Sequence, residues 1–338
     1  MKWQACNVLT YPSFSKNNTK QAVNPVSIGW QDWALVLLVG GVALLLYGRT
    51  LTPGLLAGDG GEFQTLAYLW GHSHPTGYPV YLTLARLFTF LPTGELAYRV
   101  NLFSAVLAAV AVAGVYINGR LLTHYRLISF IGAMVIAVSA TFWSQALIAE
   151  VYTAGAAFIV WIIAALLWWR IHGSQRALFM AGLLGGLSVG VHMSVALLAP
   201  AVLLYLLLPQ GKIKDWRLEI KSLLFNLRTP ILGTLIGLTM TVTLFLLMNW
   251  HNPTASYFTA VIEPSRSAWG LSAKQIDGAF ERLFWGWQAR QFQTFMGETA
   301  VFSQQAAAYW ANLPNQFSGL FIILAFMGGV VLMIKRWQ

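Results

Sequence analysis

The chain has 338 residues, of which 57% are hydrophobic and only 9% are charged, with a formal net charge of +10. Soluble globular domains carry about 25% charged residues, so this composition excludes an ordinary soluble protein and predicts an all-α protein that spans a membrane several times. The single cysteine, Cys6, excludes an intrachain disulfide. The basic residues are spread along the chain rather than gathered in one patch, so we expect no nucleic-acid partner.

The first 30 residues are polar and contain no apolar run. A cleavable signal peptide needs such a run, so we interpret residues 1–30 as a cytoplasmic tail. No internal repeat is visible in the rest of the chain. We therefore predict a single transmembrane domain over residues 31–338.

Apolar stretches predict membrane-spanning helices at about 33–47, 101–119, 127–143, 153–169, 230–250 and 317–334. The stretch 78–91 is bounded by two prolines and is too short for the ~30 Å hydrocarbon core at about 1.5 Å per residue, so an interfacial or re-entrant helix is expected there. The stretch 177–208 is long for one helix and short for two. If it crosses twice, most Lys and Arg residues lie on the cytoplasmic side, so the positive-inside rule favours about eight spans.

This topology places two loops, 49–100 and 250–316, on the non-cytoplasmic face. Most of the 11 acidic residues fall on that face. The second loop is rich in aromatic residues, which is typical of a membrane interface, and we expect an amphipathic helix near 280–295 in contact with membrane lipids. The charge rule holds for a bacterial inner membrane and for the endoplasmic reticulum alike, so either membrane fits the sequence.

Two acids lie in the glycine-rich stretch Gly58-Asp59-Gly60-Gly61-Glu62-Phe63. Asp59 and Glu62 have the spacing of a capping box, in which Asp59 would cap the helix that follows. A simple cap does not need two glycines, whereas close approach of a substrate to the backbone does. A carboxylate at such a position can act as a general base, so the loop 49–100 is the candidate catalytic loop.

The stretch after this helix contains His72 and His74, followed by a turn with two prolines that ends at Tyr78. The H-x-H spacing occurs in metal sites, but no cysteine and no third histidine lie nearby, so no metal is predicted. We expect His74 either to donate to a phosphate or hydroxyl group or to cap the turn. Proline and glycine make this turn rigid.

Three further polar residues lie near the ends of predicted spans: Arg99, Glu150 and His192. Arg99 either extends to the membrane interface or pairs with a lipid phosphate. Glu150, followed closely by Tyr152, is either a functional carboxylate or a solvated loop acid. His192 either packs between helices or faces the same cavity as Glu150. Before it, glycines spaced four residues apart predict a face for close helix contact (Gly182, Gly186 and Gly190).

The order of these motifs resembles that of the protein O-mannosyltransferase-like transmembrane family, which is part of the glycosyltransferase C superfamily. The resemblance covers residues 33–200. It rests on the stretches Gly58-Asp59-Gly60-Gly61-Glu62-Phe63, His74-Pro75-Thr76-Gly77-Tyr78-Pro79, Arg99-Val100-Asn101-Leu102-Phe103-Ser104, Glu150-Val151-Tyr152 and Gly186-Leu187-Ser188-Val189-Gly190-Val191-His192. Thr76 departs from the pattern, which has a second proline at this position.

The resemblance implies an enzyme that takes a sugar, for example mannose, from a polyprenyl-phosphate donor. The sugar is transferred to a hydroxyl of an acceptor protein or glycan on the outer or lumenal face. Asp59 matches the acid that serves as the base in this family. Glu62 or Glu150 would then orient the acceptor, and the donor phosphate would be bound by the group His74, Arg99, His192, Tyr152 and Tyr78. The lipid-linked sugar is a co-substrate, so no further cofactor is expected.

Two other classes of protein fit the composition. A transporter would use several spans and a polar entrance, but transporters usually carry ionisable residues near the membrane midplane and contain internal repeats. A non-catalytic membrane scaffold would leave the acids and histidines on one face unexplained. The sequence therefore favours the glycosyltransferase.

Overall fold

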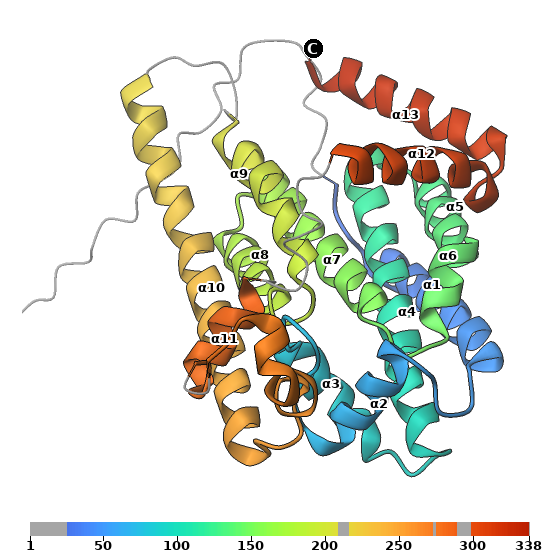
Figure 1. Cartoon of the computed structure of the whole chain (residues 1–338). Helices are drawn as coiled ribbons and strands as arrows, with labels where there is room; N and C mark the ends of the chain where they lie inside the picture. Colours follow the sequence, from blue (N-terminus) through green and yellow to red (C-terminus); the bar gives the residue numbers. More distant parts are fainter. Residues whose placement is uncertain (1–25, 209–215, 273–274, 289–298, 338) are drawn as a thin grey trace, which may run out of the picture.

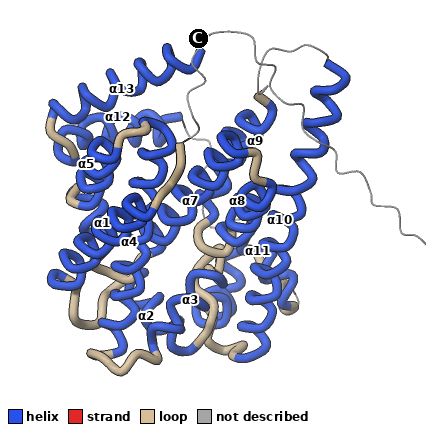
Figure 2. The backbone as a smooth tube through the Cα atoms, turned by 180° about the vertical axis from the view of Figure 1, so that it is seen from behind, coloured by secondary structure: helices blue, strands red, loops and turns tan. Residues whose placement is uncertain are grey.

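The computed structural model describes residues 26–208, 216–272, 275–288 and 299–337. Within these residues the regular elements are helices (Figures 1 and 2), so the predicted all-α fold is confirmed. The only bridge of β type in this part of the chain joins His72 to Ser256. Most of the predicted tail, residues 1–25, lies outside the described residues, as do residues 289–298 of the second loop.

The α-helices are α1 (Trp30–Thr50), α2 (Asp59–Leu69), α3 (Pro79–Thr89), α4 (Leu96–Thr123), α5 (Arg126–Ala137), α6 (Ala140–Ala146), α7 (Val151–His172), α8 (Gln175–Ser188), α9 (Ala199–Leu207), α10 (Trp216–His251), α11 (Ala279–Trp287), α12 (Thr299–Gln316) and α13 (Gly319–Trp337). Shorter helical turns are η1 (Met193–Leu198), η2 (Phe258–Ile262) and η3 (Glu263–Trp269). The helices α2, α3 and α11 lie at one end of the molecule, and α12 and α13 lie at the other end (Figure 1).

Four helices are long and apolar enough to cross a membrane: α1, α4, α7 and the part of α10 from Asn226 to His251. Two further pairs pass the same test but are bent, α5 with α6 by 66° and α12 with α13 by 110°. The protein is thus a multi-span membrane protein with four to six candidate spans in the described residues. The predicted eight spans are not confirmed, because α8 and the helical stretch Met193–Leu207 reach only about 21 Å and about 26 Å.

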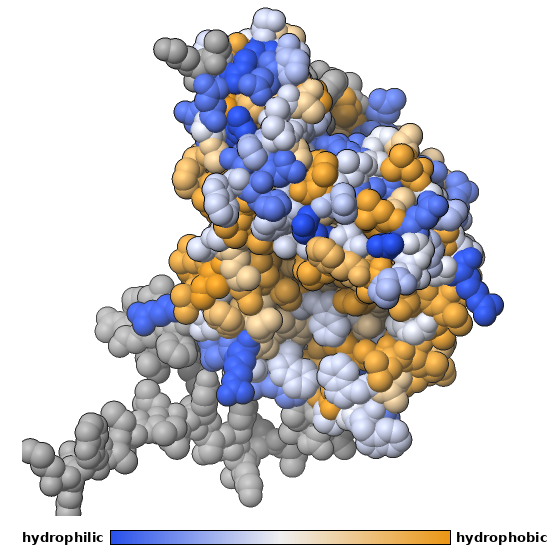
Figure 3. All heavy atoms as spheres, turned by 90° about the horizontal axis from the view of Figure 1, so that it is seen from below, coloured by the Kyte–Doolittle hydropathy of each residue, from blue (hydrophilic) through white to orange (hydrophobic). Residues whose placement is uncertain are grey.

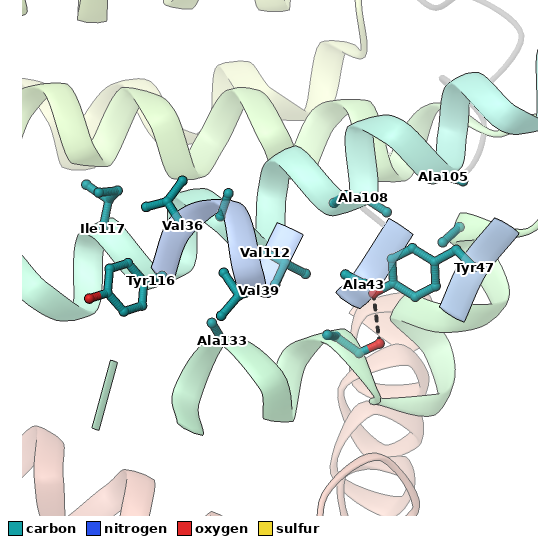
Figure 4. Close-up of a cluster of buried hydrophobic side chains, with 14 of the residues drawn as sticks. Val36, Val39, Ala43, Tyr47, Ala105, Ala108, Val112, Tyr116, Ile117 and Ala133 are labelled. Atoms are coloured by element: carbon teal, nitrogen blue, oxygen red, sulfur yellow. Dashed lines mark hydrogen bonds between the residues drawn. The ribbon is translucent and has the colours of Figure 1, made fainter. Parts of the chain in front are cut away.

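The largest core cluster joins α1 to α4 and α5 (Figure 4). Val39, Ala43 and Tyr47 of α1 are fully buried against small residues of α4 such as Ala108. The Tyr47 hydroxyl donates a hydrogen bond of 2.8 Å to the carbonyl oxygen of Ala137 at the end of α5. The small side chains let the helices approach closely, and the hydrogen bond satisfies the buried hydroxyl.

An ion cluster fixes the other end of these helices. Asp32 of α1 is fully buried, and its carboxylate accepts hydrogen bonds from Arg120 at 2.6 Å, Arg126 at 3.0 Å and Tyr116 at 3.0 Å. These partners come from α4 and α5. A single carboxylate therefore joins three helices.

The predicted glycine face on α8 is confirmed. A Cβ atom on Gly186 would meet the backbone of Thr234 and Leu238 in α10, and one on Gly182 would meet the backbone of Pro230. Only glycine permits this backbone contact. The chain then bends after α8, and the carbonyl oxygen of Gly190 accepts hydrogen bonds from the first amides of α3. These contacts bring the bend that carries His192 next to α3.

The short helix expected near 78–91 is α3, and the helix expected near 280–295 is α11 as far as the described residues extend. Their position at a membrane interface stays a prediction.

Candidate active site

The helix α2 begins at Asp59, and its N-cap residue is Gly58, whose φ of 65° suits glycine. No side-chain hydrogen bond caps this helix. The capping-box interpretation of Asp59 and Glu62 is therefore wrong. Both side chains are left to face the loop that follows α2.

The two glycines after Asp59 have a structural reason. A Cβ atom on Gly60 would lie 2.8 Å from the side chain of Leu56, and one on Gly61 would meet the carbonyl oxygen of Leu56. Close packing of the preceding loop thus requires both glycines, and substrate approach is not needed to explain them. The buried Gln64, which the sequence analysis did not single out, holds this loop by accepting a hydrogen bond of 3.0 Å from the Leu56 amide.

Glu62 binds the residues that follow α2. One of its oxygens accepts hydrogen bonds of 2.8 Å from the Ser73 hydroxyl and from the backbone amide of His74. The other oxygen lies 3.0 Å from Nδ1 of His74. The carboxylate therefore fixes both the backbone and the ring of His74.

The second ring nitrogen of His74 faces two further groups. Nε2 lies 3.1 Å from the hydroxyl of Tyr78 and 4.0 Å from a carboxylate oxygen of Asp59. With Nδ1–H donating to Glu62, Nε2 of the neutral ring accepts from the Tyr78 hydroxyl. The side chain of Asp59 is 61% exposed, whereas that of His74 is 14% exposed. Asp59 is thus the carboxylate of this cluster that a ligand can reach from outside.

The charges of this cluster support one another. Burial disfavours the charged form of His74, but the hydrogen bond and the charge of Glu62 outweigh it and raise the pKa of His74. Burial is likewise the largest single influence on Glu62 and opposes its ionisation, but the hydrogen bonds from His74 and Ser73 together with the charge of His74 outweigh burial and lower the pKa of Glu62. The pair is therefore ionised over a wider pH range than either residue would be alone.

Glu150, Tyr152 and His192 lie beside this cluster. Glu150 is the N-cap residue of α7, and burial together with the negative charge of Asp59 raises the pKa of its carboxyl group. The ring of His192 lies 6.0 Å from the ring of Tyr78 and 5.7 Å from that of Tyr152, measured between centroids. Nδ1 of His192 accepts a hydrogen bond from the Ser194 amide, so Nε2 of the neutral ring carries the proton. Burial and the nearby charge of His74 lower the pKa of His192.

Arg99 is not brought to the cluster. Its guanidinium donates to the carbonyl oxygens of Thr89, Thr93 and Gly94, at the end of α3 far from Tyr78. The length of α3 separates the two ends by about 16 Å. In this structure Arg99 closes the turn between α3 and α4.

His72 also lies apart from the carboxylates. Its ring is buried, stacks on Phe245 at 4.0 Å and has no hydrogen-bond partner for either nitrogen atom in its side chain. Burial lowers the pKa of His72 to about 4, so the ring is neutral at physiological pH. The H-x-H motif thus places its two histidines in different environments.

Residues 59–215 match the family model described as "Protein O-mannosyl-transferase TMEM260 N-terminal domain". The predicted resemblance to the protein O-mannosyltransferase-like family is confirmed. The matched region contains the whole cluster from Asp59 to His192.

Two relatives illustrate the similarity to this family. Protein O-mannosyl-transferase TMEM260 of Mus musculus is 33% identical over 137 residues, which cover 39% of this chain and 20% of the relative. Protein O-mannosyl-transferase tmem260 of Dictyostelium discoideum is 22% identical over 313 residues, which cover 87% of this chain and 36% of the relative. The chain therefore spans between a fifth and about a third of the length of these relatives. No solved structure matches the chain significantly.

An outer groove adjoins the cluster, and an inner groove lies beside the bend that carries His192. The outer groove encloses about 530 Å³ between the first turns of α2 and residues 254–261, and Glu62 is part of its lining. The inner groove encloses about 450 Å³ between α7, α8, η1, α9 and α10. Ser188 and Val195, on either side of His192 in the chain, line the inner groove. The described residues that line it include no charged side chain.

Asp59, Glu62 and His74 each offer an atom that can bind a metal ion, and these atoms all lie within 4.8 Å of one another. The hydrogen bonds within the cluster do not favour such a site. Both Glu62 oxygens and both His74 ring nitrogens already have partners. The 4.0 Å between Asp59 and His74 also exceeds the separation of about 3.4 Å expected for two ligands of a tetrahedral zinc ion.

Proposed function

We propose that this chain is a membrane glycosyltransferase that moves mannose from a polyprenyl-phosphate donor to a hydroxyl of an acceptor protein. The observation that carries this proposal is the exposed Asp59 carboxylate beside the Glu62–His74 pair, inside the region similar to the O-mannosyltransferase family. The names of the relatives supply the sugar and the class of acceptor. The predicted topology places the cluster on the non-cytoplasmic face.

Asp59 acts as the general base in this proposal. Its carboxylate takes the proton of the acceptor hydroxyl while the hydroxyl oxygen forms a bond to the anomeric carbon of the sugar. The bond between that carbon and the phosphate oxygen breaks, and the phosphate leaves with the electron pair. General-base catalysis typically contributes about 10²- to 10⁴-fold to the rate.

His74 supports the leaving phosphate. The raised pKa of His74 favours a positive charge near the atoms that become negative in this step. Because both oxygens of Glu62 are occupied by Ser73 and His74, we assign Glu62 the role of positioning His74 rather than of orienting the acceptor. The half-buried Glu150 is left to bind a hydroxyl of the acceptor or the sugar.

The aromatic residues beside the cluster fit a sugar. The rings of Tyr78 and Tyr152 lie 6.0 Å and 5.7 Å from the ring of His192, and Tyr152 is exposed. Nε2–H of His192 and the Tyr152 hydroxyl can donate to sugar or phosphate oxygens. Arg99 has no part in this proposal, because its donors are bound by the turn after α3.

The inner groove has the lining and length that a lipid-linked donor would need. It runs along α10 from Leu227 to Leu238, a distance of about 16 Å, and its outer end lies beside the bend of His192. A prenyl chain in this groove would place its phosphate near His192 and His74.

We also propose that no metal cofactor is required. The leaving group is a phosphate monoester, whose charge the His74 imidazolium and neutral donors can balance. The hydrogen bonds of Glu62 and His74 would have to break before a metal ion could bind all three residues.

The test is transfer by the full chain in proteoliposomes supplied with polyprenyl-phosphate mannose and an acceptor protein. Asp59→Asn is expected to abolish transfer while the protein remains folded. The matched control is Asp277→Asn, which changes an exposed acid paired with Arg266 at 2.7 Å outside the cluster. Unchanged transfer by Asp59→Asn would remove Asp59 from its role, and a loss in both variants would indicate a nonspecific effect of charge.

A further inference from the structure

The outer groove has a lining of mixed chemistry. Leu56, Leu66 and Val261 supply apolar walls, and Thr65, Thr254 and Ser256 supply hydroxyl groups. Figure 3 shows the molecule from the end that carries α2 and α3, with hydrophobic residues around a hollow near the centre. Among the described residues that line the outer groove, Glu62 is the only charged one.

The outer groove is continuous with the carboxylate cluster. Glu62 lines the groove with its side chain 25% exposed. The Glu62 carboxylate lies within 4.8 Å of the Asp59 carboxylate and of His74. A hydroxyl group that enters along this groove therefore arrives at Asp59.

The two grooves lie on different sides of the cluster. Glu62 lines the outer groove, whereas the inner groove is lined by residues on either side of His192 in the chain, Ser188 and Val195. A displacement at the anomeric carbon needs the acceptor and the leaving phosphate on different sides of the sugar. The inner groove suits the donor, so the outer groove is left for the acceptor.

We propose that the outer groove binds an extended segment of the acceptor polypeptide and presents a Ser or Thr hydroxyl to Asp59. This inference rests on the proposed function, and it further specifies which acceptor sequences the enzyme prefers. Apolar side chains of the segment pack on Leu56, Leu66 and Val261. The hydroxyls of Thr65 and Thr254 donate their own protons to Gly61 and Asn252, so their oxygens can accept hydrogen bonds from its backbone amides.

The lining disfavours a glycan as acceptor. A sugar chain carries many hydroxyl groups, and each one that is buried without a partner costs about 1–3 kcal/mol. Leu56, Leu66 and Val261 offer such groups no partner, and the protons of the Thr65 and Thr254 hydroxyls are already donated within the protein. The apolar walls do shield valine or leucine side chains from water.

The acidic residues near the groove further restrict the sequence of the acceptor segment. Glu62 lines the groove, and the carboxylate of Asp59 lies within 4.8 Å of the Glu62 carboxylate, so two acids lie where the acceptor hydroxyl would arrive. An acidic residue next to the acceptor hydroxyl would therefore be repelled. The preferred segment has a Ser or Thr between uncharged apolar residues.

The experiment compares two short peptides as acceptors in proteoliposomes with polyprenyl-phosphate mannose. One peptide has a central Thr flanked by valines, and the other has the same Thr flanked by glutamates. Release of free mannose from the donor by water is measured alongside, because it reports donor use without any acceptor. The wild-type chain is expected to use the valine peptide at a KM at least about tenfold lower than the glutamate peptide.

Three variants locate the effect. Ala260→Trp and Thr65→Trp fill the outer groove from opposite walls, and each is expected to raise the KM for the valine peptide at least about tenfold with donor hydrolysis unchanged. Ala268→Trp is the matched control, because Ala268 is also exposed, on the neighbouring turn η3, but does not line the groove. It is expected to behave like the wild type.

Several results would overturn the inference. Normal peptide transfer by Ala260→Trp and Thr65→Trp would show that the groove is not used, and an equal loss in Ala268→Trp would show that the effect does not depend on the groove. A preference for the glutamate peptide would contradict the charge argument. Donor hydrolysis that depends on Asp59, with no transfer to either peptide, would overturn this inference and leave the transferase in place. Absence of any Asp59-dependent reaction of the donor would instead overturn the proposed function.

Discussion

Nδ1 of His74 lies 3.0 Å from one oxygen of Glu62, while the other oxygen accepts the backbone amide of the same histidine at 2.8 Å. A single carboxylate thus sets the position, the tautomer and the charge of the imidazole. The opposite nitrogen then points to Tyr78 and Asp59. Any chemistry at Asp59 takes place beside a histidine that Glu62 has oriented.

The first prediction concerns this orientation. Glu62→Gln keeps the size of the side chain but removes the charge that favours the imidazolium, so kcat for mannose transfer is expected to fall about 10²-fold. The KM for the donor is expected to change little. Glu62→Asp, which keeps the charge, should recover part of kcat. Equal kcat values for Glu62→Gln and the wild type would contradict the positioning role.

The second prediction is a pH dependence of stability. The raised pKa of His74 means that its charged form stabilises the fold fully below the unfolded pKa of about 6.5, and this stabilisation is lost as the pH rises through the raised folded value. The lowered pKa of Glu62 gives stability above its unfolded pKa of about 4.5, which is lost as the pH falls through the folded value. Glu62→Gln removes both contributions.

The thermal midpoint of Glu62→Gln should therefore fall furthest below that of the wild type between about pH 4.5 and pH 6.5. The gap should narrow as the pH rises above that range. The difference between the two thermal midpoints is measured by tryptophan fluorescence, with both proteins in the same detergent. A gap that is constant with pH would contradict the ionic coupling of the pair.

The cluster could be predicted in part from the sequence. Asp59, Glu62 and His74 were singled out because acids and histidines are rare in so apolar a chain. Their pairing could not be predicted, because it depends on the return of the chain after α2. That return is fixed by distant residues: the amide of His72 donates to the carbonyl of Ala255, and a Cβ atom on Gly71 would meet the same carbonyl.

The partners of Arg99 could not be predicted from the local sequence. An arginine at the start of a span predicts a partner in the lipid headgroups, but the turn before α4 leaves carbonyl oxygens that bind the guanidinium first. No motif marks this arrangement. It follows from the path of the chain between Thr89 and Gly94.

The fold was predictable where apolar residues form one uninterrupted helix, as in α1, α4 and α7. The span expected at 127–143 is instead broken between α5 and α6 by a 66° bend. No proline marks the break, and the Ser139 hydroxyl binds the carbonyl of Ile136 at this point. Hydropathy measures length and composition, so it does not detect such a bend.

The third prediction concerns the contact of α8 with α10. Gly186→Ala is expected to destabilise the protein by about 1–3 kcal/mol, because the new methyl group meets the backbone of α10. Gly185→Ala is the matched control, since a Cβ atom there meets nothing within 4 Å. It is expected to be neutral or stabilising by up to about 1 kcal/mol. Thermal unfolding measures both, and equal midpoints would show that the helices are farther apart than the structure has them.

The fourth prediction concerns the ion cluster at Asp32. Asp32→Asn leaves the buried Arg120 without a counter-charge, which is expected to cost about 3 kcal/mol of stability. The control is Asp277→Asn, whose exposed pair with Arg266 contributes about 0–1 kcal/mol. Similar unfolding midpoints for the two variants would mean that water reaches the Asp32 cluster and replaces the lost charge.

The fifth prediction concerns metal removal. The wild-type chain is expected to keep its transfer activity after dialysis against EDTA. The atoms of Glu62 and His74 that could bind a metal ion are instead hydrogen-bonded to each other, to Ser73 and to Tyr78. Metal content measured by mass spectrometry shows whether removal was complete. Loss of activity that a divalent ion restores would contradict the proposal and would favour the alternative, in which the ion breaks these hydrogen bonds and binds Asp59, Glu62 and His74 together. In that case Tyr78→Phe, which frees Nε2 of His74, should bind the ion more tightly than the wild type does. If the cluster holds no metal, added divalent ions should leave the activity of Tyr78→Phe unchanged.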